Sequence, residues 1–432
     1  MIRALLAVAL LALGAPARAA VDIQEVTSPG GITAWLVEEP SIPFLALEIR
    51  IRGGANLDRE GARGAVNLMA ALLEEGSGDL DARAFQERRE ALAASFGFSA
   101  YDDAVAVSAT MLSENRDEAV ALLRGALTEP RFDADAVERV RGQVLSGLAS
   151  DAQDPQTIAG NALNALAFGD HPYGSSTDGT PESVAALTRE DLVEAHADTL
   201  TRDRVFVGAV GDITPEELGA LLDDLLGGLP AEGPPLPPDV PVGLEGGVTV
   251  IDYPSPQSVA LFGQEGIARE DPDYFAAHVL NHVLGGGGFE SRLMAEVREE
   301  RGLTYGIGTS LVPKDHAALW LGSVASANET VAEAIGVVRD IWADVAANGV
   351  TDAELEAAKT YLTGEYPLRF DGNAEIASIL VGLQMIGLPR DYVVNRNAYV
   401  EAVTSADVAR VAARLMDAEA LTFVVVGQPE GL

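Results

Sequence analysis

The chain has 432 residues, of which 48% are hydrophobic and 22% are charged, a composition typical of globular proteins and not of disordered ones. It contains no cysteine, which excludes disulfides, thiol catalysis and cysteine-ligated zinc. The 66 acidic residues outnumber the 29 lysines and arginines, so the net charge is −37 and nucleic acid and anionic lipid are not expected as partners. The length predicts two or three domains.

The N-terminal segment has the pattern of a cleavable signal peptide. Arg3 supplies a positive charge, residues 4–13 form an apolar run too short to span a bilayer, and residues 17–19 (Ala-Arg-Ala) match a small-x-small cleavage site. We therefore expect residues 1–19 to be removed and the protein to be exported to a bacterial periplasm. The signal alone leaves full secretion open. No second long apolar stretch and no cysteine at the cleavage point follow, so we expect no membrane anchor.

The mature chain is expected to consist of two similar halves. The proline-rich segment 230–246 reads as a linker between an N-terminal domain, 20–229, and a C-terminal domain, 247–432. Segment 187–212 resembles segment 403–428, an offset of 403 − 187 = 216. Each has a threonine N-cap, an amphipathic helix and a closing apolar strand. A repeat longer than 200 residues indicates a duplicated domain and not a solenoid.

Each half mixes strands with long helices. Residues 45–54 and 104–112 alternate apolar and polar side chains, the pattern of half-buried strands. Residues 116–129 and 329–349 show the i, i+3, i+4 spacing of amphipathic helices. These patterns predict an α+β fold, with a mostly antiparallel sheet in each half and helices on one face of it.

Two of the five histidines are four residues apart on one predicted helix. His278 and His282 could face one metal ion, but no acidic residue stands between them and the helix is otherwise apolar. We expect hydrogen-bonded structural histidines, with a metal site as the alternative. His171, in the turn His-Pro-Tyr-Gly, is likewise expected to be structural.

A glycine run, Leu-Gly-Gly-Gly-Gly-Phe at 284–289, is not followed by Lys-Ser/Thr, so it is not a phosphate-binding loop. We expect it to be a hinge between two helices. The chain also lacks a Gly-x-Ser-x-Gly motif, so a serine hydrolase has no support.

The segment 290–310 reads as a helix that Gly302 ends, followed by a strand. Arg298 near the end of the helix and Tyr305 at the start of the strand could both donate hydrogen bonds to one carbonyl oxygen. On the pattern alone, Arg298 could equally pair with a neighbouring glutamate, and Tyr305 could be an ordinary sheet residue.

The whole mature chain resembles the insulinase/pitrilysin family of zinc metallopeptidases, especially its mitochondrial-processing-peptidase-like branch. The motifs that carry the resemblance are the duplicated halves, HPYG at 171–174, LGGGGF followed by SRLMAEVREERGLTYGI, and the closing strand VFVGAVGD. The resemblance implies two homologous domains arranged as a clamshell around a peptide chamber.

The resemblance also implies that this chain has lost the zinc site of the family. Family members carry His-x-x-Glu-His on a helix of the first half and a further glutamate on a later helix. The three motif positions fall here on Asn67, Ala70 and Ala71, and the distal glutamate on Ser146 or Gly147. No histidine occurs between residues 20 and 170, so a shifted alignment does not restore the motif. We therefore expect no zinc or other cofactor in this chain.

Arg298 and Tyr305 match an arginine and a tyrosine that hold the substrate carbonyl in active members of the family. The resemblance then implies a non-catalytic subunit of a heterodimeric zinc metalloendopeptidase, with zinc in a homologous partner and peptides as substrates. Segment 94–109 resembles the edge strand to which such peptides add. The alternatives are a catalytically dead structural scaffold and a stand-alone peptide-binding protein.

Overall fold

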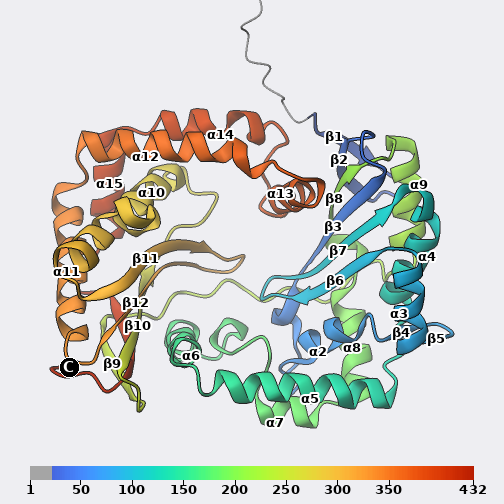
Figure 1. The fold of residues 1–432 in the computed structure, drawn as a ribbon, viewed down its shortest axis with the longest axis horizontal. Coiled ribbons are helices and arrows are strands. Elements are labelled where there is room, and N and C mark those ends of the chain that lie inside the picture. The colour runs from blue at the N-terminus through green and yellow to red at the C-terminus, as the bar shows by residue number, and fades with distance from the viewer. Residues whose placement is uncertain (1–21) are drawn as a thin grey trace, which may run out of the picture.

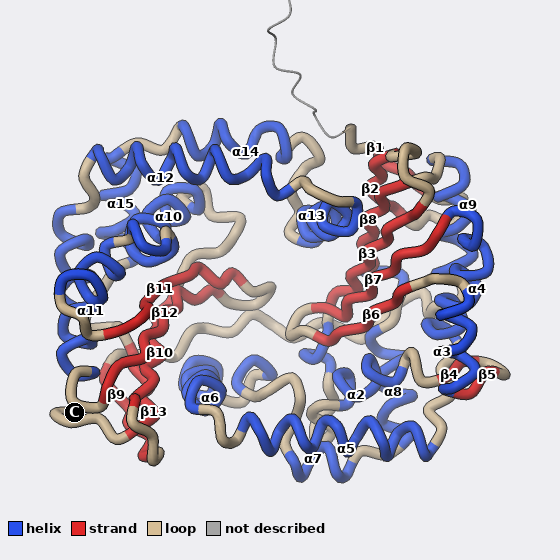
Figure 2. The backbone as a smooth tube through the Cα atoms, viewed as in Figure 1, coloured by secondary structure: helices blue, strands red, loops and turns tan. Residues whose placement is uncertain are grey.

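The computed structural model describes residues 22–432 (Figure 1), so the predicted signal peptide lies outside the described residues. Within them, no helix is both long enough and apolar enough to cross a membrane. Two sheets face each other across the molecule, and most helices lie outside them (Figure 2).

The first sheet has six strands in the order β1-β2-β8-β3-β7-β6. All neighbours pair antiparallel except β2 and β8, which are parallel. The strands are β1 (Gln24–Thr27), β2 (Thr33–Glu38), β3 (Phe44–Arg52), β6 (Ser95–Ala100), β7 (Ala104–Leu112) and β8 (Val205–Gly211). A short ribbon of β4 (Gly76–Ser77) and β5 (Leu80–Asp81) stands apart from this sheet.

The second sheet repeats this plan without a counterpart of β1. Its order is β11-β12-β10-β13-β9, and its single parallel pair, β13 with β9, corresponds to β8 with β2. The strands are β9 (Gly247–Asp252), β10 (Gln257–Glu265), β11 (Thr304–Pro313), β12 (Ala318–Ala327) and β13 (Thr422–Gly427). The matching strand order confirms the predicted duplication and the mostly antiparallel α+β fold.

Helices accompany each sheet. Those of the first half are α2 (Ala65–Leu72), α3 (Ala82–Ala91), α4 (Arg116–Thr128), α5 (Ala134–Asp151), α6 (Pro155–Phe168), α7 (Pro181–Ala186), α8 (Arg189–Thr199) and α9 (Pro215–Leu226). Those of the second half are α10 (Tyr274–Asn281), α11 (Val331–Asn348), α12 (Asp352–Glu365), α13 (Asn373–Met385), α14 (Tyr392–Glu401) and α15 (Ser405–Leu415).

The repeated helices begin where the threonine pattern predicts. Thr188 caps α8 and Thr404 caps α15, each in a reciprocal capping box with the aspartate three residues later. Each helix is then followed by an interior strand of a sheet, β8 or β13. The local signal and the tertiary packing therefore agree in both copies.

Each sheet packs on its outer helices through a large apolar core. One core is formed by residues between Val26 and Leu229, the other by residues between Ala260 and Val425. At about 25 cal/mol per Å² of apolar surface removed from water, cores of this kind supply the main stabilising free energy of each half. Residues 230–246 contribute to neither core and contain no helix or strand.

The two halves exchange one helix each, which the sequence patterns do not indicate. Helix α6 of the first half packs on β10 and β13 of the second sheet, and α13 of the second half packs on β3 and β8 of the first (Figure 1). The contacts are apolar. Ala159 and Leu163 meet Val424, and Leu380 meets Val210. Each sheet is therefore covered on its inner face by a helix from the other half.

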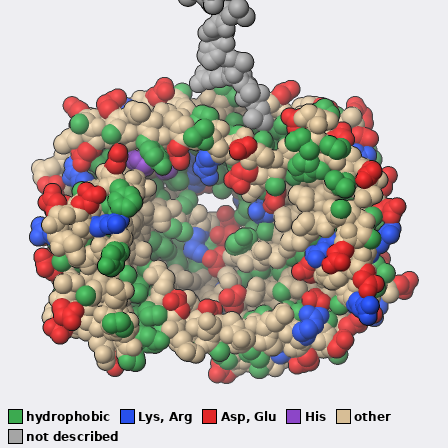
Figure 3. Space-filling view, viewed as in Figure 1, with side chains coloured by type: hydrophobic (Ala, Val, Ile, Leu, Met, Phe, Trp, Pro, Cys, Tyr) green, Lys and Arg blue, Asp and Glu red, His purple; other side chains and the backbone are tan. Residues whose placement is uncertain are grey.

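The tips of two corresponding hairpins also meet between the halves. Lys314 in the β11–β12 turn forms an ion pair with Asp102 in the β6–β7 turn. Beside it, the Asp315 backbone N–H donates to Asp103 over 3.2 Å, and the Asp315 carboxylate forms an ion pair with Arg52 over 2.8 Å. A central opening remains between the halves (Figure 3).

Candidate functional site

The zinc-motif positions lie on helix α2, whose start is fixed by an upstream carboxylate. The side chain of Asp58 accepts the backbone N–H groups of Gly64 and Val66 over 2.8 and 2.9 Å and pairs with Arg63 over 3.2 Å. A negative charge at this end of the helix also complements the helix dipole. Burial nevertheless raises the pKa of the Asp58 carboxyl, because the two backbone donors and Arg63 only partly offset the loss of hydration.

Asn67 and Ala71 lie one turn apart on the accessible side of α2. Asn67 is half-buried and Ala71 is exposed, whereas Ala70 is 1% exposed and faces the core. Helix α5 packs beside α2 and exposes Ser146 and Gly147. Among residues 22–432 no group of three or more His, Asp or Glu side chains is placed to hold a metal ion. The side chains at these positions supply one amide and no carboxylate or imidazole, so they do not fit zinc.

The predicted edge strand is found beside this helix. β6 ends the first sheet, bonds to β7 on one side only, and packs against α2. Its other side offers backbone N–H and C=O groups to which an extended peptide can add. The edge position is therefore confirmed for residues 95–100 of the predicted segment 94–109, whereas residues 104–109 belong to the interior strand β7. Addition of a peptide to β6 stays a prediction.

Arg298 and Tyr305 flank the junction between a helix and β11. Arg298 belongs to a π-helical segment, Met294–Glu300, and its guanidinium lies 4.4 Å from the centre of the Phe289 ring. Tyr305 is 85% exposed, at the point where the register of β11 shifts between Thr304 and Ile307. In the described part of the chain the two side chains make no hydrogen bond to each other.

The structural alternatives for this pair are weak. The neighbouring Arg301, not Arg298, approaches Glu296 and Glu333, over 3.8 and 3.9 Å. The Tyr305 hydroxyl packs into no core, because its side chain projects from the bulge into solvent. Both donors are thus available to a ligand.

The glycine run lies between two helical segments, as expected, with Gly285 buried and with Gly286 and Gly288 exposed. A hinge motion at this run stays a prediction. After α10 the chain continues as a π-helical turn, His282–Gly286, against β11. A Cβ on the buried Gly285 would stand 2.5 Å from Thr309 Oγ1 and 2.7 Å from Thr309 N. Thr309 donates to Asn281 Oδ1 over 2.9 Å, and Trp320 donates to the same oxygen over 2.8 Å. The absence of a side chain at Gly285 therefore lets the π-helical turn lie directly against β11. The contact is beside the buried hydrogen bonds of Asn281.

The histidines have structural partners. The His278 ring stacks on Tyr274, and its Nε2 is 3.3 Å from an Nη of Arg396. His282, one turn on, lies against Tyr361 with ring centres 4.9 Å apart. His171 accepts the backbone N–H of Tyr173 over 3.2 Å and so caps the Pro172–Gly174 turn. The cationic Arg396 beside His278 opposes binding of a metal there.

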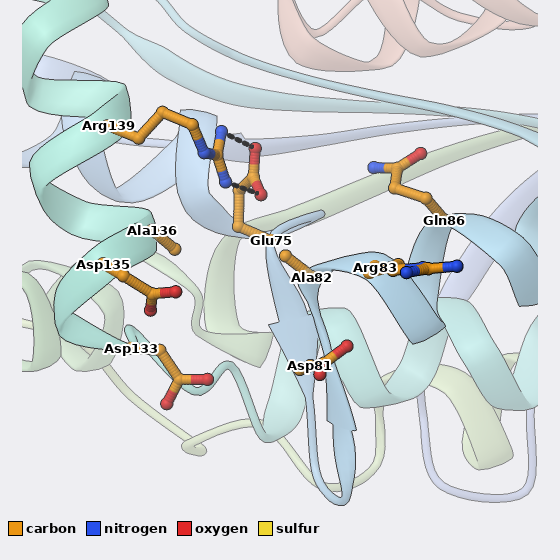
Figure 4. A pocket seen from close by; sticks show the side chains of 9 residues that line it. All are labelled: Glu75, Asp81, Ala82, Arg83, Gln86, Asp133, Asp135, Ala136 and Arg139. Carbon is orange, nitrogen blue, oxygen red and sulfur yellow. Dashed lines mark hydrogen bonds and ion pairs between the residues drawn. The ribbon is translucent and has the colours of Figure 1, made fainter.

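An acidic cavity of about 550 Å³ opens between α3 and the start of α5 (Figure 4). Three of its four carboxylates have direct partners, and the fourth, Asp135, lies in the first turn of α5. Asp81 caps α3, Asp133 pairs with Arg131 over 2.6 Å, and Glu75 forms a two-pronged pair with Arg139. The cavity is therefore accounted for by helix capping and ion pairing.

Residues 34–181 match the sequence model of the Insulinase (Peptidase family M16) family, and residues 186–362 match that of the Peptidase M16 inactive domain. The crystal structure of a peptidase M16 inactive domain from Pseudomonas fluorescens is similar, with a TM-score of 0.87 and 30% identity over 94% of this chain and 98% of that one.

Two related proteins have different descriptions. An uncharacterised zinc protease of Mycobacterium leprae is 29% identical over 78% of this chain and 77% of its own length. A non-peptidase homolog of Helicobacter pylori is 26% identical over 82% of each chain. Since two descriptions of one family match successive segments, and a relative of 30% identity is covered almost completely, the chain belongs to peptidase family M16, the insulinase family.

Proposed function

We propose that this protein is a non-catalytic subunit of an exported heterodimeric zinc metalloendopeptidase. The observation that carries the proposal is a contrast between the halves. The zinc-motif positions hold Asn67, Ala70 and Ala71, whereas Arg298 and Tyr305 remain accessible to a ligand. A homologous partner would carry the zinc, and this chain would contribute half of a peptide chamber.

The relatives are compatible with this assignment and do not decide it. One is described as a zinc protease and another as a non-peptidase homolog, so the family includes both kinds of chain. The residues of this chain place it with the second kind. Without a histidine at Asn67 or Ala71 and a glutamate at Ala70, it has neither zinc ligands nor a base to activate water.

The proposal assigns a domain plan and a compartment. Residues 1–19 form the signal peptide, 20–229 the first peptidase-like domain, 230–246 the linker and 247–432 the second domain. The two separate cores and the repeated strand order support this division. The signal-peptide pattern supports the periplasm.

In the assembled enzyme, Arg298 and Tyr305 would donate hydrogen bonds to the carbonyl oxygen of the substrate. Negative charge builds on that oxygen as the tetrahedral transition state forms, so each donor stabilises the transition state more than the ground state. The guanidinium offers a planar fork of donors, and the phenol offers one. Zinc in the partner would activate the attacking water.

The test uses this chain reconstituted with a homologous subunit that carries an intact His-x-x-Glu-His. We expect Arg298→Ala and Tyr305→Phe each to lower kcat/KM by about 10²–10³ while the complex still assembles. Arg301→Ala, at the C-cap of the same helical segment, is the matched control and should retain activity. Arg298→Lys should restore activity only in part, because an ammonium cannot reproduce the fork.

A purely structural role for the pair predicts something else. Any loss of activity would then be accompanied by a lower thermal midpoint and weaker subunit association of the same variant. Full activity of both single variants, or a loss that follows unfolding, would remove Arg298 and Tyr305 from the mechanism.

A further inference from the structure

A second cavity, of about 480 Å³, lies in the C-terminal half between α10, α13 and α14. Aromatic and aliphatic side chains form most of its wall. Three arginines also line it, Arg269 before α10, Arg369 after α12 and Arg396 on α14, together with one acidic residue, Glu375. The cavity is separate from both Arg298 and the zinc-motif helix, and neither contributes to its lining.

Two of the three arginines, Arg396 and Arg269, have neutral partners. Arg396 is 5% exposed, and its guanidinium contacts the Leu362 carbonyl and His278 Nε2. Arg269 donates to the Tyr392 hydroxyl over 3.0 Å. Within residues 22–432, no carboxylate lies within ion-pairing distance of any of the three, although acidic residues outnumber basic ones by 66 to 29. Most other arginines of the described chain do pair with a carboxylate, as Arg414 does with Asp271 over 2.6 Å.

Three of the four permanently charged side chains that line the cavity are cationic. Burial, followed by the charges of Arg396, His282, Arg269 and Arg369, lowers the pKa of His278 to about 4. His278 is therefore neutral at pH 7 and leaves the charge of the arginines unchanged. Glu375 is exposed at the edge of the cavity.

One polar group of the wall has no partner. The Tyr366 hydroxyl is buried and makes no hydrogen bond within the described chain, and the Arg396 guanidinium lies 4.7 Å from the centre of its ring. Burial raises the pKa of Tyr366 to about 12, so the phenol remains a donor at pH 7. A buried hydroxyl without a hydrogen-bond partner destabilises the fold, and a ligand oxygen that accepts from it would remove this cost.

We propose that this cavity binds a carboxylate carried on an apolar or aromatic body. The arginines match a carboxylate because their paired N–H groups face its two oxygens. The apolar wall fits the remainder of the ligand, and the volume falls within the usual range of small-molecule sites. The C-terminal carboxylate of a peptide and a free aromatic acid share this chemistry. The inference does not depend on a zinc-bearing partner.

The experiment is isothermal titration calorimetry on the intact mature chain. The probes are N-acetyl-leucyl-phenylalanine, the same peptide with a C-terminal amide, 3-phenylpropionate and inorganic phosphate. We expect the free acid to bind at least about tenfold more tightly than the amide, since one charge-assisted hydrogen bond is worth at least that factor. Tighter binding of the dipeptide than of 3-phenylpropionate identifies a peptide terminus as the source, and the reverse identifies a free acid.

The variants are Arg369→Gln and Arg269→Gln, because the buried Arg396 also bonds to the backbone and its loss could unfold the half. Each should weaken binding of the free acid by about tenfold and leave the amide unaffected. Arg189→Gln, an exposed arginine of the first half that makes no ion pair in the described chain, removes the same charge elsewhere and should change nothing. Equal binding of acid and amide, unchanged binding by both variants, or phosphate binding as tight as the acid would overturn the proposal.

Discussion

Acid should destabilise the C-terminal half through one histidine. In the fold, Nε2 of His278 accepts from the Arg396 guanidinium, which can only donate, so the ring carries its proton on Nδ1. Protonation would place a second donor against the guanidinium within a buried site. The pKa of His278 is accordingly lowered from 6.5 to about 4, first by burial and then by Arg396.

Proton linkage gives the direction and the size of this change in the free energy of unfolding. Between pH 6.5 and 4 the unfolded chain binds this proton and the folded chain does not, so stability is complete above pH 6.5 and is lost as the pH falls. The full shift corresponds to about 3 kcal/mol, and about 2 kcal/mol of it is lost between pH 7 and pH 5. His278→Gln keeps an acceptor for Arg396 but does not titrate, so its stability should fall less over that interval, by about the same 2 kcal/mol.

Urea unfolding at pH 7 and pH 5 measures the difference. Trp320 and Trp342, two of the three tryptophans, are buried in the core of this half, so their fluorescence reports its unfolding. Carboxylates and histidines that do not interact with His278 titrate alike in both proteins and cancel in the comparison. Equal losses of unfolding free energy in the wild type and His278→Gln would refute the argument.

The remaining predictions concern metal, packing and the contact between the halves. After dialysis, the isolated chain should retain no stoichiometric zinc and cleave no peptide; about one bound zinc per chain would contradict this. Gly208→Ala should destabilise the fold by about 1–3 kcal/mol, since a Cβ there would stand 2.3 Å from the Ala377 carbonyl oxygen, whereas Gly147→Ala, with open space around it, should stabilise by about 0.5–1 kcal/mol. A double-mutant cycle of Lys314→Gln and Asp102→Asn should give a coupling of about 0.5–1 kcal/mol in thermal stability, and a value of zero would show that the hairpin tips do not support each other.

The repeat and the main elements could be predicted because their signals are local or recur in the chain. Alternation at 104–112 coincides with β7, and the helix predicted at 116–129 ends one residue earlier in the structure. The predicted stop at Gly302 is confirmed, with a left-handed φ of 65° there and β11 starting at Thr304. In each case the residues that form the element also carry the pattern that predicts it, within one short segment.

The arginine cavity could not be predicted in this way. Arg269, Arg369 and Arg396 are separated by up to 127 residues, and each alone is typical of an exposed helix end or surface. Only the packing of α13 and α14 beside α10 brings them to one cavity. The close packing of Gly285 could not be predicted for a related reason, because a run of glycines indicates conformational freedom, whereas the approach of Gly285 to Thr309 depends on the tertiary fold.

The exchanged helices limit how the two halves can move. α13 fits β8 because Gly208 lets the backbone of the helix approach the strand, and its apolar face is buried against a sheet of the other half. α6 makes the corresponding contact with β13. Separating either helix from its sheet would expose apolar surface at about 25 cal/mol per Å². An opening of the clamshell therefore costs the least free energy if α13 moves with the first sheet and α6 moves with the second. The chain would then bend at the ends of these two helices and in the segment 230–246. The hairpin tips at Lys314 and Asp102 would separate in the same motion.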